Sequence, residues 1–198
     1  TYGGWSQTGN ATHNTVILSG ADVTGYSNVY GGGSGNASAD VTTGNTLRVT
    51  TKENRIRQFQ NFEKLEFELS SGIISGDWLL SAIGYGPNTS FDWSDVKVVG
   101  LKDWVTALNA AGTNDPKLTL YIGKPISLNN YTPRLIDNSG DYEFGTFATG
   151  GTLASGTMTG ATEIKLAGNK FQNVTSPVVD TATSSVHGGY SSYGNTTN

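Results

Sequence analysis

A Tyr-Gly-Gly phrase that returns in the same context constrains the fold of this chain more than any other sequence feature. Its first copy, at residues 2–4, is followed by Gly-Asn-Ala-Thr at residues 9–12 and by Val-Ile-Leu at residues 16–18. Its second copy begins at Tyr30 and is followed by Gly-Asn-Ala-Ser and by an apolar segment around Leu47. A repeat of about 20 to 30 residues with a short apolar strand and Gly/Asn turns is typical of one coil of a parallel β-solenoid. The sequence therefore predicts an all-β chain of stacked coils.

A third copy closes the chain, with His187 in the place of the tyrosine. The Tyr-Gly-Gly repeats thus occupy residues 1–50 and 186–198. Because both ends look like cuts through an array, residues 1–198 are interpreted as one β-solenoid segment of a longer protein. The end coils of such a segment expose unpaired strand edges, which favour association. We therefore expect end-to-end self-association of the isolated fragment.

Stacked coils place equivalent side chains one strand spacing apart, about 4.8 Å. Tyr2 and Tyr30 are therefore expected to stack. Asparagines at a repeated corner are expected to form a hydrogen-bonded ladder, and the candidates are Asn10, Asn36 and Asn195.

The composition excludes several classes of function. The chain has 27 glycines, which suit the left-handed corners of stacked coils. It has no cysteine, which excludes structural disulfides, thiolate metal sites and cysteine nucleophiles. A net charge of −4 gives no reason to expect a nucleic acid partner. No apolar run approaches the roughly 18 residues needed to cross a bilayer, so we expect no direct membrane insertion by this segment.

Strands are also predicted in the middle of the chain, where the repeat fades. Leu65, Phe67 and Leu69 alternate with two glutamates, which predicts a strand with one buried face. Apolar residues at helical spacing between Leu101 and Leu108, followed by Gly112, predict one short helix.

The stretch 83–113 fits the repeat poorly. It is interpreted as a short helix or a loop excursion from the stacked coils.

Four short phrases accompany the Tyr-Gly-Gly repeats: Asn-Thr-Leu-Arg-Val at residues 45–49, Asn-Phe-Glu-Lys-Leu-Glu-Phe at 61–67, Gly-Asp-Trp-Leu at 76–79 and Leu-Ile-Asp-Asn-Ser-Gly at 135–140. Together they resemble the passenger regions of large bacterial autotransporter adhesins. The resemblance implies a right-handed parallel β-helix that is extracellular, displayed on or released from the surface of a Gram-negative cell. It also implies extended display and attachment to a host-cell or surface receptor, with glycans among the candidate ligands, and no catalysis.

The two histidines give little reason to expect chemistry. His187 aligns with Tyr2 and Tyr30 and is expected to fill an aromatic stacking position, and His13 lies in a Gly/Asn/Thr-rich turn. Neither has a zinc-binding spacing. We expect no metal, no cofactor and no catalytic residue.

Carboxylates require a separate test, because β-helical enzymes that act on polysaccharides use clustered Asp or Glu. Asp92, Trp93 and Asp95 lie in a turn-rich segment, and with Trp104 they are the candidate ligand-binding residues. The favoured interpretation of this segment is a solvated loop whose tryptophan packs on the core. A second acidic group, Asp137, Asp141 and Glu143, is interpreted as part of a turn between strands. The alternative function is a β-helical carbohydrate-active enzyme or a phage tailspike segment that binds polysaccharide.

Overall fold

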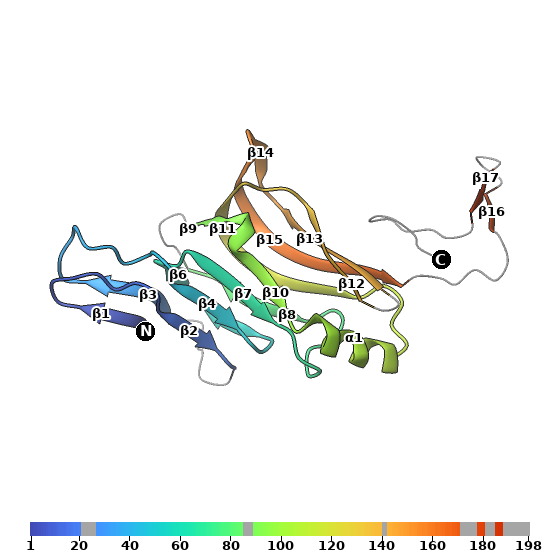
Figure 1. Cartoon of the computed structure of the whole chain (residues 1–198), viewed down its shortest axis with the longest axis horizontal. Coiled ribbons are helices and arrows are strands. Elements are labelled where there is room, and N and C mark those ends of the chain that lie inside the picture. The colour runs from blue at the N-terminus through green and yellow to red at the C-terminus, as the bar shows by residue number, and fades with distance from the viewer. Residues whose placement is uncertain (21–26, 85–88, 140–141, 171–177, 181–184, 188–198) are drawn as a thin grey trace.

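The computed structural model describes residues 1–20, 27–84, 89–139, 142–170, 178–180 and 185–187. Within these ranges the secondary structure consists of strands, one α-helix and one 3-10 helix, so the expected all-β class is confirmed. Figure 1 shows the first strands as narrow stacked sheets at one end and a large curved sheet beyond them.

Two narrow sheets contain only parallel strands. The first has the order β1-β3-β6 and the second the order β10-β7-β4-β2. The strands are β1 (Tyr2–Ser6), β2 (Thr15–Leu18), β3 (Asn28–Ser34), β4 (Thr46–Val49), β6 (Gln58–Gln60), β7 (Lys64–Glu68) and β10 (Val96–Val99). Neighbouring strands come from successive passes of the chain, with Tyr2 opposite Tyr30 and Thr15 opposite Thr46.

The large sheet begins with parallel strands and continues with antiparallel ones. Strands β5, β8 and β11 are parallel, whereas β15, β13 and β12 follow in antiparallel pairing. The short strand β9 pairs with β11, and β14 pairs with β15. The bounds are β5 (Asn54–Ile56), β8 (Trp78–Ala82), β9 (Thr89–Asp92), β11 (Lys117–Asn129), β12 (Arg134–Ser139), β13 (Tyr142–Thr149), β14 (Thr152–Ala154) and β15 (Thr157–Lys170).

The antiparallel part differs from the expectation of parallel coils along the whole chain. After β11 the consecutive strands β12 and β13, and β14 and β15, are joined by short connections that reverse the chain and pair as antiparallel hairpins, while β11 pairs antiparallel with the later strand β15. Within residues 83–113, β10 pairs with β7 and therefore stays in the sheet. Among the described residues of that stretch, the 3-10 helix η1 (Trp93–Asp95) and the α-helix that follows β10 depart from the sheets.

That helix, α1 (Leu101–Ala110), confirms the predicted short helix. Its buried side chains include the predicted Leu101, Val105 and Leu108. Gly112 has a φ of 68°, the left-handed conformation that commonly ends helices. No helix in the described ranges has the length and apolarity needed to cross a bilayer.

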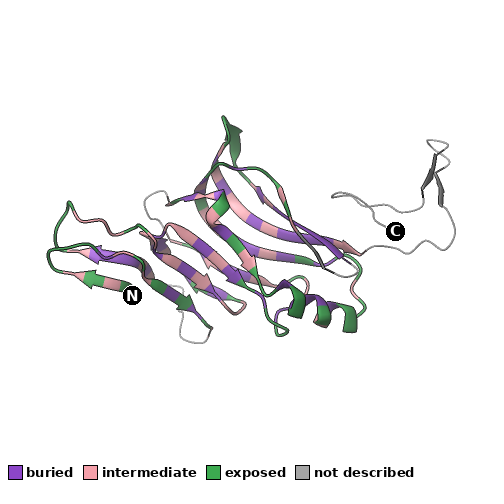
Figure 2. Cartoon of the chain, in the orientation of Figure 1, coloured by how far each residue is buried: buried purple, intermediate pink, exposed green. Residues whose placement is uncertain are grey.

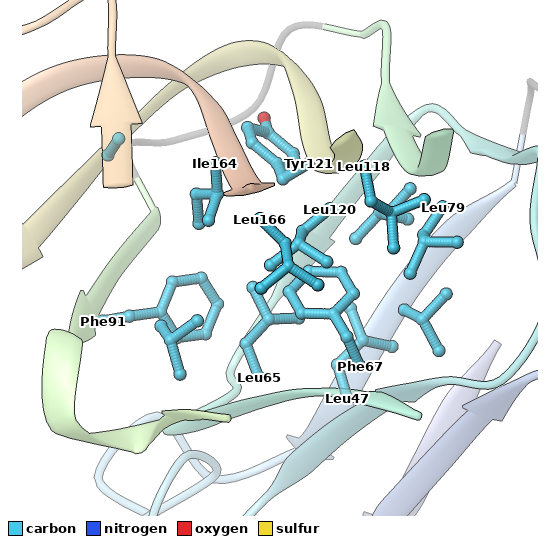
Figure 3. Close-up of a cluster of buried hydrophobic side chains, with 14 of the residues drawn as sticks. Leu47, Leu65, Phe67, Leu79, Phe91, Leu118, Leu120, Tyr121, Ile164 and Leu166 are labelled. Carbon is cyan, nitrogen blue, oxygen red and sulfur yellow. The ribbon is translucent and has the colours of Figure 1, made fainter. Parts of the chain in front are cut away.

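The core lies between the β4–β7 sheet and the large sheet. Leu47, Leu65 and Phe67 extend from β4 and β7 and are fully buried. In Figure 3 they face Leu120 and Leu166 of the large sheet. Each such side chain contributes about 1.5–3 kcal/mol by its burial. The predicted alternation in β7 is confirmed, and Figure 2 shows similar alternation of buried and less buried positions along the large sheet.

A buried asparagine connects three successive passes of the chain. Asn45 precedes β4, and the two N–H groups of its Nδ2 are shared among the carbonyl oxygens of Ala11 (3.0 Å), Val41 (2.6 Å) and Asn61 (3.1 Å). Its Oδ1 accepts from the backbone nitrogen (2.8 Å) and Nδ2 (3.0 Å) of Asn14. Asn45 thus satisfies backbone groups that the corners would otherwise bury without partners.

The predicted ladder between Asn10 and Asn36 is wrong. Asn36 Nδ2 donates to the carbonyl oxygen of Thr8 (3.1 Å), and Asn10 Oδ1 accepts from the backbone nitrogen of Asp40 (2.9 Å). Both side chains bridge neighbouring passes through the backbone. The asparagine side chains that do join two passes are those of Asn14 and Asn45, immediately before β2 and β4.

Most of the third repeat copy lies outside the described residues, including Asn195. Of that copy, His187 ends β17 (Ser185–His187), which pairs antiparallel with β16 (Val178–Asp180). The backbone of His187 is therefore paired with Val178.

Candidate functional site

The two predicted site tryptophans belong to the core. Trp93 is 2% exposed and Trp104 is fully buried. The Trp93 ring packs edge-on against Tyr131 at 5.0 Å, and the Arg134 guanidinium lies 5.5 Å from its centroid. Trp104 Nε1 donates to the carbonyl oxygen of Ile73 at 2.7 Å. Neither indole presents an open face to a ligand.

The predicted carboxylates lie beside these rings but have local contacts of their own. Asp92 caps the 3-10 helix η1 (Trp93–Asp95) by accepting from the backbone nitrogen of Ser94 at 2.9 Å, and Asn130 Nδ2 donates to its other oxygen at 2.6 Å. Hydrogen bonds from the Ser94 side chain and backbone and from Asn130 hold the pKa of Asp92 below its ordinary value. Asp95 is half-buried at the end of η1. The arrangement is that of a capped turn, which matches the solvated-loop interpretation.

The second acidic group belongs to a strand pair, and its interpretation as a turn is wrong for two of its members, since Asp137 lies in β12 and Glu143 in β13. Glu143 is buried within β13, whereas the side chains of Asp137 and Asp141 lie outside the described residues. His13 has a φ of 58° and its ring covers Gly44. The described ranges contain no group of three or more His, Cys, Asp or Glu side chains that could hold a metal ion.

A different surface combines aromatic and polar side chains. Neighbouring strands of the large sheet place Phe147 opposite Lys165, Lys165 opposite Thr119, and Thr119 opposite Trp78. Opposite residues carry their side chains on the same face of a sheet. Leu166, next to Lys165, is buried in the core, so the row lies on the outer face.

A second row on the same face contains small residues. Lys117 lies opposite Ala167, which lies opposite Gly145, and Gly145 lies opposite Leu135. Because alanine and glycine rise little above the backbone, the sheet is hollowed beside Phe147. One hollow of about 400 Å³ includes Lys117, Phe147 and Ala167 in its lining, and an adjoining one of about 280 Å³ includes Leu135, Gly145 and Phe147.

We call this surface the outer trough and define it by six residues: Trp78, Thr119, Gly145, Phe147, Lys165 and Ala167.

Two ion pairs border the outer trough. Lys117 Nζ lies 2.8 Å from an Asp115 oxygen, and Lys165 Nζ lies 2.8 Å from Glu163 Oε2. The same Glu163 oxygen accepts from Thr149 Oγ1 at 2.9 Å. Hydrogen bonds from Lys165 and Thr149 hold the pKa of Glu163 below its ordinary value. The trough therefore has charged donors and acceptors side by side.

The row ends at Trp78, which is half-buried. The Arg55 guanidinium lies 5.9 Å from its ring centroid. Arg55 is opposite Ser81, and Ser81 is opposite Ile122, which is 39% exposed. The outer face therefore carries both polar and apolar side chains beyond the trough.

The N-terminal repeats form a second exposed aromatic cluster. The rings of Tyr2 and Tyr30 are stacked, as the repeat predicted, and Trp5 contacts Tyr2 edge-on at 5.2 Å. A Cβ at Gly33 would lie 2.6 Å from the Trp5 ring, so glycine at this position lets the indole lie on the strand. These contacts give the tyrosines a structural role.

Sequence reasoning missed the outer trough because its parts are far apart in the chain. The strand pattern around Lys165 marks its side chain as solvent-facing. No pattern, however, reveals that Phe147 and Thr119 flank it, because that depends on the register of β13, β15 and β11.

Comparison of the chain with protein-family models, with curated proteins and with solved structures finds no match in any of the three.

Proposed function

We propose that this chain is a segment of a right-handed parallel β-helix that serves as a non-catalytic attachment scaffold on a bacterial surface protein. The observation that carries the proposal is the parallel register of the narrow sheets. Strands from successive passes lie in chain order in both, β1-β3-β6 and β2-β4-β7-β10. A chain that returns to the same sheets in the same direction at each pass makes a coil.

The corner contacts support the same interpretation. A Cβ at Gly31 would lie 2.1 Å from the carbonyl oxygen of Asn61, and one at Gly32 would lie 2.1 Å from that of Ala11. The glycines of the second Tyr-Gly-Gly copy therefore permit close approach of the neighbouring passes. Together with the hydrogen bonds of Asn45, these glycines let successive passes of the chain pack against one another, which gives the repeat a structural role.

The surface location belongs to the proposal through the resemblance to autotransporter adhesins. In that role the protein is extracellular on a Gram-negative cell and attaches to a host-cell or surface receptor. The absence of catalysis is supported by the capping role of Asp92, whose two carboxylate oxygens accept hydrogen bonds from Ser94 and Asn130. This carboxylate already has partners that maintain local structure.

An attachment assay tests this function. Beads coated with the folded chain are expected to bind epithelial cells or mucin-coated plastic at least tenfold more than beads coated with the thermally unfolded chain. Equal binding by the two preparations would contradict attachment. In parallel, incubation with neutral and acidic polysaccharides should release no reducing ends. Cleavage of any of them would favour the polysaccharide-degrading alternative.

A further inference from the structure

We propose that the outer trough binds a neutral oligosaccharide that lies across the strands, with Phe147 and Trp78 packed against its sugar rings. The inference goes beyond the proposed function because it does not require the narrow sheets to form a β-helix. It rests on the large sheet alone.

The spacing of the two aromatic residues favours an extended ligand. Phe147 and Trp78 stand on one face and are separated by three strand spacings, or about 14 Å at 4.8 Å each. Lys165 and Thr119 lie between them. A ligand that contacts both rings must therefore be a chain of several sugar units lying perpendicular to the strands.

The shape of the outer face leaves room for a ligand beside the Phe147 ring. Ala167, which is 4% exposed, and the buried Gly145 make a low part of the face next to Phe147, and hollows of about 400 and 280 Å³ both include Phe147 in their lining. Phe147 is half-buried although its neighbours Thr146 and Ala148 are buried, so its ring is available from the outer face. Aromatic rings at the edge of a concave surface bury apolar area on a ligand without moving.

The charges favour a neutral ligand over an acidic one. Lys117 and Lys165 are each paired with a carboxylate, so these two lysines add no net charge to the trough, and Arg55 lies at its Trp78 end. Sugar hydroxyl groups both donate and accept hydrogen bonds, and they match a surface where ammonium, carboxylate and threonine groups alternate. The Lys165–Glu163 pair is partly exposed, and such pairs contribute little stability, so both members can turn to a ligand at small cost.

Titration calorimetry with linear neutral hexasaccharides of glucose, mannose or galactose tests the proposal. At least one is expected to bind the unmodified chain. Phe147→Ala and Trp78→Ala are each expected to weaken that binding at least tenfold. Trp5→Ala is the matched control, because Trp5 is an exposed tryptophan outside the trough, 60% accessible, and its removal should leave the affinity unchanged.

Two additions keep the test decisive. Thermal melting identifies a variant that no longer folds, and Lys165→Ala, a change at the surface, is then expected to weaken binding in its place. Linear hexagalacturonate forms the acidic arm, and it should bind more weakly than the neutral ligand. The proposal is overturned if no neutral hexasaccharide binds, if only the acidic ligand binds, or if Trp5→Ala reduces affinity as much as the trough variants do.

Discussion

Tyr2 and Tyr30 stack across neighbouring strands, with ring centroids 4.7 Å apart and planes inclined by 16°. They are an in-register pair of β1 and β3, and each opens a Tyr-Gly-Gly copy. Tyr2 remains 48% exposed, so the contact lies at the surface of the stack. Tyr30 also accepts a hydrogen bond from Gln58 at 3.3 Å, which links it to the next strand, β6.

The stacked pair should contribute measurably to stability. Tyr30→Ala is expected to lower the free energy of unfolding, because aromatic pairs contribute about 0.5–1.5 kcal/mol beyond the area they bury. A double-mutant cycle with Tyr2→Ala, followed by urea denaturation, isolates that coupling. Strictly additive effects of the two changes would show that the rings do not interact in solution. Oligosaccharide binding at the outer trough should be unaffected by either change.

Asn45 should be the most sensitive polar position in the narrow sheets. Its replacement by alanine leaves the carbonyls of Ala11, Val41 and Asn61 and the backbone nitrogen of Asn14 without this partner. Buried unpaired polar groups cost about 1–3 kcal/mol each, and the sites at Val41, Asn61 and Asn14 are only partly buried, so Asn45→Ala is expected to destabilise the chain by about 3–5 kcal/mol in urea denaturation, near the upper limit for a single substitution.

Asn36→Ala is the matched control for that measurement. Asn36 is exposed, and water can replace its side-chain hydrogen bonds to the backbone of Thr8 and Ser38. Its loss is expected to cost about 1 kcal/mol or less. Similar costs for the two variants would mean that the bridging role of Asn45 is not what stabilises the corners.

The sequence predicts those parts of the fold that depend on local pattern. Leu65 and Phe67 alternate with glutamates and are buried, and Leu101, Val105 and Leu108 form the inner face of α1. In both cases the period of two or of 3.6 residues alone fixes which side chains face the core.

Features that depend on corner geometry or long-range register are not predictable in this way. Asn10 and Asn36 occupy equivalent places in the repeat, yet each bonds to backbone, because the turns direct the side chains along the corner. Trp93 is buried in η1 although Asp92, Ser94 and Asp95 around it are polar, whereas Trp104 falls at helical spacing from Leu101 and so lies on the inner face of α1. The outer trough arises from the pairing of β8, β11, β15 and β13, which hydrophobic periodicity does not encode.

Asp40 should make the chain less stable at low pH. Hydrogen bonds from the Thr43 side chain, from the Thr43 backbone and from the Thr42 backbone lower the pKa of Asp40 to about 2. A carboxyl group whose pKa is lower in the folded state stabilises the protein above its unfolded pKa of about 3.9, and that contribution is lost as the pH falls toward 2. Urea midpoints measured between pH 5 and pH 2 should therefore fall less steeply for Asp40→Asn than for the unmodified chain. Parallel profiles for the two proteins would contradict this role of Asp40.

The parallel register of β2 and β4 can be tested with thiols, because the chain contains no cysteine of its own. Thr15 lies opposite Thr46, and both side chains face away from the buried Val16 and Leu47. In-register positions on adjacent strands are about 4.8 Å apart. A short thiol-specific cross-linker should therefore join Thr15→Cys to Thr46→Cys within the folded chain.

The matched control for the cross-link places the second thiol on the same face but out of register. Thr50 lies four residues beyond Thr46, about 13 Å further along the strand direction at 3.3 Å per residue. Thr15→Cys with Thr50→Cys should therefore react much more slowly, as judged by mass spectrometry of the digested chain. Faster linkage of Thr15→Cys to Thr50→Cys than to Thr46→Cys would place β2 and β4 in another register and remove the main support for the coiled scaffold. It would leave the proposed oligosaccharide site unaffected, because the outer trough lies entirely on β8, β11, β13 and β15.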